Sequence, residues 1–87
     1  MYIIIVYDVE VERLNKVRRF LRTKLHRVQN SAFEGEVTEA KLEKIKQGLL
    51  KIIDKERDCI YIYKARRRED IDREVIGVQK ALLDRLY

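Results

Sequence analysis

The sequence predicts a small α+β fold in which two helices cover one face of an antiparallel sheet. β-branched and aromatic residues dominate two runs, 1–8 and 59–63, which is typical of strands. Apolar residues recur at helical spacing over 11–25 and again over 39–53. The segment 26–37 between the two helical patterns reads as strand structure with a turn or a bulge. The order strand, helix, two strand pieces, helix, strand is the ferredoxin-like βαββαβ arrangement.

Length and composition predict one domain over residues 1–87. A domain of 87 residues buries a smaller fraction of its surface than a larger one, and it often gains stability by pairing with a second copy. The single cysteine, Cys59, excludes an intrachain disulfide and a cysteine-based zinc cluster within one chain. No stretch has the length of a signal-peptide core or a membrane span. We therefore expect a soluble cytoplasmic protein with no membrane partner.

The first strand ends in a carboxylate. The apolar run that begins at Met1 suits a strand in the middle of a sheet, buried on both faces. An ionised carboxylate is costly to bury, so Asp8 should lie where this strand emerges toward solvent. Asp8 is the first candidate for metal binding or catalysis. The alternative, that Asp8 only ends the strand or caps the following helix, is the more common role for a lone Asp at a strand end.

The sequence predicts a basic outer face for the first helix. Apolar residues from Val11 to Leu25 mark its inner side. Between 13 and 27 the charged residues are all basic: Arg13, Lys16, Arg18, Arg19, Arg22, Lys24 and Arg27. A face built only for solubility usually mixes signs and forms ion pairs. With a net charge of +5 on the chain, this face is either simply solvated or a binding surface for phosphates.

The segment 26–37 keeps no strict alternation of apolar and polar residues. It fits a hairpin with its turn near Gln29 and Asn30, or one strand kinked by a bulge with Gly35 near its end. The only histidine, His26, has no second His or Cys nearby in the sequence. We interpret it as a polar residue at a strand start rather than a metal ligand.

The second helix begins after Thr38, a plausible N-cap, and its outer face mixes acids and bases. Gly48 lies inside this pattern at a cost of about 1 kcal/mol relative to Ala, so we expect it to permit close packing on the sheet. A charged connector, 54–58, then leads to a second run suited to an inner strand, in which Cys59 is most simply a small buried hydrophobe.

The arrangement of strands predicts a dimer. The runs 1–8 and 59–63 should lie side by side in the centre of the sheet, with helices on one face. The opposite face would stay exposed and apolar, which favours a sheet-to-sheet homodimer. Beyond the basic cluster 64–68, residues 73–78 fit a short strand and 79–87 a final short helix. A continuous helix from Ile71 also fits the spacing, and periodicity alone does not decide.

The candidate chemistry is metal-assisted cleavage of a nucleic acid. The chain lacks a glycine-rich phosphate loop, a defensible Ser-His-Asp set, and HExxH or CxxC motifs. It also lacks the signature of RNA-recognition modules that stack bases on a sheet. Phosphodiester cleavage needs carboxylates for the ion and cations for the phosphates. One Asp8 is too few for Mg²⁺, but two copies packed about a two-fold axis could share one ion, which predicts inactive monomers.

Several of these stretches resemble one known family. YIIIVYD at 2–8, the basic helix, RVQNSAFEGE at 27–36 and DCIYIY at 58–63 are similar to the second core CRISPR-associated protein, Cas-two. EVIG at 74–77 resembles the last strand of that family. The strand end and the 27–36 stretch are specific when taken together.

The resemblance implies a function and its partners. It implies a homodimer in which the segment 64–87 contributes a strand to the partner's sheet, so we take 74–78 as a strand. It implies a Mg²⁺ or Mn²⁺ site at the symmetric Asp8 residues. Members are described as endonucleases on single-stranded RNA or double-stranded DNA that act in CRISPR adaptation and antiviral defence. The alternative implied is a non-catalytic dimer that bridges DNA and joins the integrase subunit during spacer acquisition.

The resemblance also assigns residue roles by position. Asp8 would bind the metal and act in catalysis, and Arg27 would contact phosphate. Three further residues would support the site. Tyr7 precedes Asp8, Ser31 would lie near the same surface, and Phe33 would pack close to the site. The two basic positions early in the family's helix correspond to Arg13 and Lys16. The remaining predicted nucleic-acid contacts are Arg18, Arg19 and Arg22.

Overall fold

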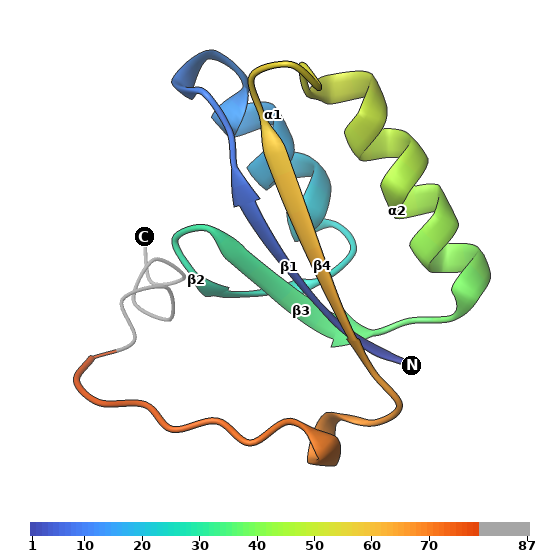
Figure 1. Cartoon of the computed structure of the whole chain (residues 1–87), viewed down its shortest axis with the longest axis vertical. Coiled ribbons are helices and arrows are strands. Elements are labelled where there is room, and N and C mark those ends of the chain that lie inside the picture. The colour runs from blue at the N-terminus through green and yellow to red at the C-terminus, as the bar shows by residue number, and fades with distance from the viewer. Residues whose placement is uncertain (79–87) are drawn as a thin grey trace.

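The computed structural model describes residues 1–78 as a four-stranded antiparallel sheet with two helices on one face (Figure 1). The sheet order is β2-β3-β1-β4. The elements in chain order are β1 (Tyr2–Asp8), α1 (Val11–Arg22), β2 (His26–Gln29), β3 (Ala32–Glu36), α2 (Glu39–Ile52), β4 (Cys59–Ala65) and the one-turn 3-10 helix η1 (Arg68–Asp70). This confirms the predicted βαββαβ order. The helix predicted at 79–87 lies outside the described residues.

β1 is the central strand of the sheet, as predicted. Its residue Ile4 has a Cα partner on each side, Glu34 in β3 and Tyr63 in β4. The prediction that β4 shares the centre is wrong, because within residues 1–78 β4 pairs with β1 alone and forms an edge. The second central strand is β3, because it forms a hairpin with β2 on one side and pairs with β1 on the other.

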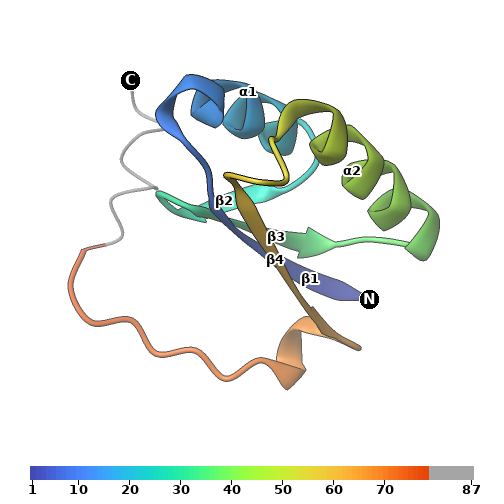
Figure 2. The same ribbon diagram turned by 45° about the horizontal axis from the view of Figure 1, so that its top comes forward.

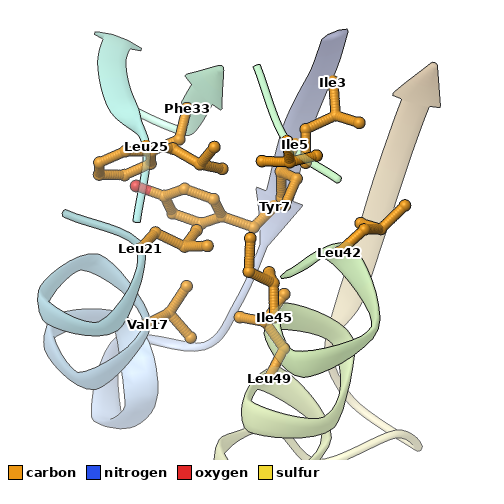
Figure 3. Packing of buried hydrophobic residues seen from close by; sticks show 11 residues of the cluster. Ile3, Ile5, Tyr7, Val17, Leu21, Leu25, Phe33, Leu42, Ile45 and Leu49 are labelled. Carbon is orange, nitrogen blue, oxygen red and sulfur yellow. The ribbon is translucent and has the colours of Figure 1, made fainter. Parts of the chain in front are cut away.

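The core lies between the helices and one face of the sheet (Figure 3). Alternation along β1 directs Ile3, Ile5 and Tyr7 toward the helices, where all three are buried. The other buried apolar side chains of this cluster are Val17, Leu21, Leu25, Phe33, Val37, Leu42, Ile45 and Leu49. Burying an aliphatic or aromatic side chain of this size stabilises a fold by about 1.5–3 kcal/mol. The helical spacing in the sequence therefore predicts the inner faces correctly.

The β2–β3 segment combines both structures that the sequence left open. It is a hairpin whose turn lies at Asn30 and Ser31, and its register shifts between Arg27 and Gln29. The shift explains the lack of strict alternation in the sequence. His26 is exposed at the start of β2, as predicted.

The start of α2 matches the sequence prediction, but the prediction that Gly48 packs on the sheet is wrong. The Thr38 hydroxyl accepts a hydrogen bond from the backbone N–H of Lys41 at 3.1 Å, which confirms the N-cap. Gly48, however, faces α1 instead of the sheet. A Cβ atom at Gly48 would lie 2.2 Å from Cζ of Phe20, so the glycine permits close approach of the two helices.

The chain beyond η1 crosses the sheet face opposite the helices, which we call the open face (Figure 2). Residues 71–78 form neither a helix nor a paired strand within the described part of the chain, so the continuous helix from Ile71 is wrong over this range. The strand predicted at 74–78, paired with a second chain, stays a prediction. Among residues 1–78, neither helix has the length and apolar character needed to cross a membrane.

Because Gly48 lies against the ring of Phe20, the effect of Gly48→Ala on stability should depend on whether that ring is present. Gly48→Ala gains about 1 kcal/mol of helix propensity but should lose about 1–3 kcal/mol to overpacking against the ring. We expect net destabilisation in the natural background and stabilisation in a Phe20→Ala background. Urea unfolding measures both, with Gln47→Ala as the exposed control on α2. An equal effect in the two backgrounds would contradict the packing described here.

Candidate metal and nucleic-acid site

Asp8 lies at the end of β1 with its side chain exposed, where the sequence places it. Alternation along β1 puts it on the open face with Ile4 and Val6. Its Cα partner in β4 is Cys59, and this is the last pair of the β1–β4 ladder. On the other side, β1 pairs with β3 only as far as Val6. Asp8 is therefore held by one neighbouring strand and by the loop that follows it.

The part of β4 beside Asp8 presents polar and aromatic groups on the open face. Cys59 is exposed, so its prediction as a buried hydrophobe is wrong. The pleat directs Cys59, Tyr61 and Tyr63 outward, whereas Ile60 and Ile62 turn toward the helices and are partly buried. The neighbouring Cys59 raises the pKa of Tyr61, and burial, Tyr63 and the Asp8 carboxylate add to the shift.

A buried carboxylate occupies the other end of the open face. Glu34 accepts hydrogen bonds from the hydroxyl of Tyr2 and the guanidinium of Arg73. Burial raises the pKa of Glu34, but the bonds from Arg73 and Tyr2 outweigh it, so the pKa is lowered. Burial and then Glu34 raise the pKa of Tyr2 to about 12. A cavity of about 350 Å³ adjoins this group. The sequence did not single out Glu34 or Arg73.

Arg13 is held by carboxylates of its own chain. Its Nε lies 2.6 Å from Oδ2 of Asp58, and its Nη2 lies 3.0 Å from Oδ1 of Asp58 and 2.8 Å from Oε1 of Glu10. The Arg13 guanidinium holds the pKa of Asp58 well below its usual range, and the pKa of Arg13 is raised in turn. Two of the three guanidinium nitrogens are thus already engaged, although the predicted contact of Arg13 with nucleic acid stays a prediction.

The other predicted basic residues follow α1 away from Asp8. Lys16, Arg19 and Arg22 are exposed. Arg18 is partly buried, and within the described residues its Nε is buried without a hydrogen-bond partner. Arg27 in β2 is also partly buried, and its Nη2 donates to Oδ1 of Asn30 at 3.3 Å. Because α1 covers the face opposite Asp8, the structure does not bring the outer part of this helix and Asp8 together (Figure 2).

The three predicted supporting residues lie on the helix side of the sheet or at the hairpin turn. Tyr7 is buried, its ring stacks on Phe33 with centroids 6.1 Å apart, and its hydroxyl donates to the carbonyl of Asn30 at 2.8 Å. Ser31 is exposed, and its backbone carbonyl accepts a hydrogen bond from the backbone N–H of Tyr7 at 3.0 Å. These contacts fix the strand just before Asp8.

The structure brings few metal ligands together in one chain. Within residues 1–78, no group of three or more His, Cys, Asp or Glu side chains is placed to hold an ion. Asp8 offers two carboxylate oxygens, which are donors that Mg²⁺ and Mn²⁺ accept. A single chain can therefore supply part of a site for such a cation, and the remaining ligands must come from elsewhere.

Comparison with known proteins gives consistent matches. A family model described as "CRISPR associated protein Cas2" matches residues 1–73. The CRISPR-associated endoribonuclease Cas2 of Methanothermobacter thermautotrophicus is 52% identical over 84 residues, covering 97% of this chain and 92% of that protein. The protein of the same name from Pyrococcus furiosus is 58% identical over 80 residues, or 92% of each chain. The crystal structure of Streptococcus pyogenes Cas2 at pH 6.5 has a TM-score of 0.79 and 35% identity, covering 88% of this chain and 100% of that one.

The low pKa of Asp58 predicts a contribution to stability that acid removes. This contribution is complete above the pKa of an unfolded Asp, about 3.9, and is lost as the pH falls through the lower folded value. Asp58→Asn should therefore lower Tm at pH 7 and reduce the fall of Tm below about pH 4. Calorimetry at pH 7 and pH 3 measures this, with the exposed Glu12→Gln as control. An equally steep loss of Tm in acid for Asp58→Asn and the natural chain would contradict the assignment.

Proposed function

The chain belongs to the CRISPR-associated Cas2 family, and from this premise we propose that it is a metal-dependent endonuclease whose homodimer holds one divalent cation between two Asp8 carboxylates. The observation that carries the proposal is the exposed carboxylate at the end of the central strand. Its relatives are named endoribonucleases, so we propose single-stranded RNA as the first substrate and duplex DNA as the second. The activity would serve CRISPR adaptation and antiviral defence in the cytoplasm.

The open face supports the dimer. Ile4 and Val6 are only partly buried, and Tyr61 and Tyr63 are 52% and 57% exposed. Apolar surface removed from water contributes about 25 cal/mol per Å², so pairing of two open faces would stabilise both copies. A two-fold axis near the Asp8 end would bring the two Asp8 side chains together. We also propose that residues 74–78 pair with the free edge of the partner's β4.

The cation would stabilise charge on the phosphate and lower the pKa of its bound water. The Asp8 carboxylates would hold it, with water or phosphate oxygens as further ligands. Tyr61 pairs with Val6 two residues before Asp8, so its exposed side chain would lie on the same face as the ion. Lys16, Arg19 and Arg22 would hold phosphates of the nucleic acid along α1.

Asp8→Ala should abolish cleavage that depends on Mg²⁺ or Mn²⁺, because it removes the carboxylate oxygens proposed to hold the ion. The assay uses labelled single-stranded RNA and double-stranded DNA with a variant whose folding and dimeric state have been verified. Glu12→Ala, which removes an exposed carboxylate in the first turn of α1, is the matched control and should cleave normally. Cleavage that persists in Asp8→Ala would move the activity to another site.

Arg18→Ala combined with Arg19→Ala should weaken nucleic-acid binding for all sequences, because it removes two charges from the basic side of α1. We expect the slope of log affinity against log salt to become shallower by about 1 to 2. Lys41→Ala with Lys44→Ala removes two exposed charges from α2 and serves as the matched control. Fluorescence anisotropy over a salt series measures both variants. An unchanged slope for the α1 variant would exclude this helix from the interface.

A second candidate function is the non-catalytic dimer that bridges DNA and joins the integrase subunit. The observation that favours it is the small number of metal ligands gathered in residues 1–78. In this role α1 would bind duplex DNA, and the segment 64–87 would contact the integrase subunit. Binding of duplex DNA without cleavage, together with co-purification of the integrase subunit, would favour this candidate over the nuclease.

A further inference from the structure

The carboxylate of Asp58 joins the segment that follows Asp8 to the turn that leads into the neighbouring strand β4. It is buried and accepts four hydrogen bonds, two of them from Arg13. The other two come from the backbone N–H groups of Glu10 and Asp54, each at 2.9 Å. Asp58 thus connects the loop after β1, the first turn of α1 and the turn before β4.

Both connected segments adjoin Asp8 directly. Glu10 follows Asp8 by two residues and is the N-cap residue of α1, without a side-chain cap of its own. Asp58 immediately precedes Cys59, which is the Cα partner of Asp8 in β4. Beyond this last pair of the β1–β4 ladder, the hydrogen bonds of Asp58 tie the chain that follows Asp8 to the segment that leads into β4. The clamp formed by Arg13, Asp58 and Glu10 therefore holds together the segment that follows Asp8 and the segment that precedes its Cα partner in β4.

The geometry of this clamp requires an arginine. Nε and Nη2 of Arg13 each contact a different oxygen of Asp58, and Nη2 also reaches Glu10. A lysine would keep the charge but could not match both oxygens in one plane. The charge alone therefore does not explain this residue.

We propose that Arg13 is a positioning residue that acts through Asp58 and Glu10 to fix Asp8 for metal binding, and that it does not contact the phosphates of the substrate. This inference rests on the proposed nuclease function. It separates Arg13 from the basic residues farther along α1, which remain available for nucleic acid. Partners that orient metal ligands typically change metal affinity by about 10- to 100-fold when they are altered.

The test compares two Arg to Lys substitutions in the full-length chain. Arg13→Lys loosens the clamp beside Asp8. Arg73→Lys alters the bond to the buried Glu34 at the opposite end of the open face and is the matched control. For each we would measure the Mn²⁺ concentration at half-maximal cleavage, kcat, RNA affinity without metal, and amide exchange of residues 7–10. Asp58→Asn is a second variant that acts on the same clamp.

Arg13→Lys should raise the Mn²⁺ midpoint by about 10-fold or more, lower kcat and accelerate exchange of residues 7–10. RNA affinity without metal and its salt slope should not change. Arg73→Lys should lower Tm while leaving the Mn²⁺ midpoint and the exchange of these amides unchanged. Asp58→Asn should change the same quantities as Arg13→Lys.

Three outcomes would overturn the proposal. Weaker RNA binding with a shallower salt slope and an unchanged Mn²⁺ midpoint would make Arg13 a phosphate contact. If Arg13→Lys and Arg73→Lys changed the Mn²⁺ midpoint and the amide exchange of residues 7–10 equally, the clamp would only stabilise the fold in general. If the natural dimer does not cleave at all, the proposed nuclease function fails. Amide exchange and direct titration with Mn²⁺ would then still test the positioning role of Arg13. Unchanged amide exchange and unchanged Mn²⁺ affinity in Arg13→Lys would overturn that role.

Discussion

The pairing of β1 on both edges is the constraint on which the rest of the structure depends. β3 and β4 both pair with it, and its inner side chains Ile3, Ile5 and Tyr7 meet residues from both helices. A strand in this position has no place for an unpaired charge along its length, because burial of a charge without a partner is costly. A carboxylate without a partner can therefore stand only where the strand ends, and Asp8 is exposed at that end.

The open face shows how two carboxylates in one sheet acquire different properties. Glu34 is buried and is satisfied by Tyr2 and Arg73, which suits a structural role because a buried charge needs a partner. Asp8 is exposed, and within residues 1–78 it forms no ion pair. In the proposed site it would accept a cation without first losing an internal partner. Burial therefore separates the carboxylate that holds the chain from the one available for chemistry.

Sequence periodicity predicts much of the fold because it reports local structure. It correctly indicates the strand β1, the inner faces of both helices, the Thr38 cap and the exposed position of Asp8. It fails where the outcome depends on which distant segments meet. The run 59–63 is apolar throughout, so its composition cannot tell that Cys59 would face outward or that β4 would form an edge.

The same limit applies to helix packing and to the candidate site. In the packing of α2, Gly48 indicates a close approach, but the sequence does not tell whether a helix or the sheet approaches it. The bonds of Arg13 to Asp58 and of Arg73 to Glu34 join residues that are 45 and 39 positions apart. The basic pattern over 13–27 counts Arg13 as free charge, and Arg73 falls outside both basic clusters of the sequence. Only the tertiary structure separates the charges that hold the chain together from those that remain for phosphate.

That separation bears on how one small domain could serve two functions. α1 lies on the side of the sheet opposite Asp8, so in the proposed dimer the basic residues would face outward while the two Asp8 carboxylates meet between the sheets (Figure 2). A duplex lying across the outer surface would need only the basic residues of α1. Cleavage would in addition require a strand to reach the end of the interface. In this geometry, binding of duplex DNA does not depend on catalysis, and loss of the Asp8 carboxylate would leave the phosphate-binding surface in place.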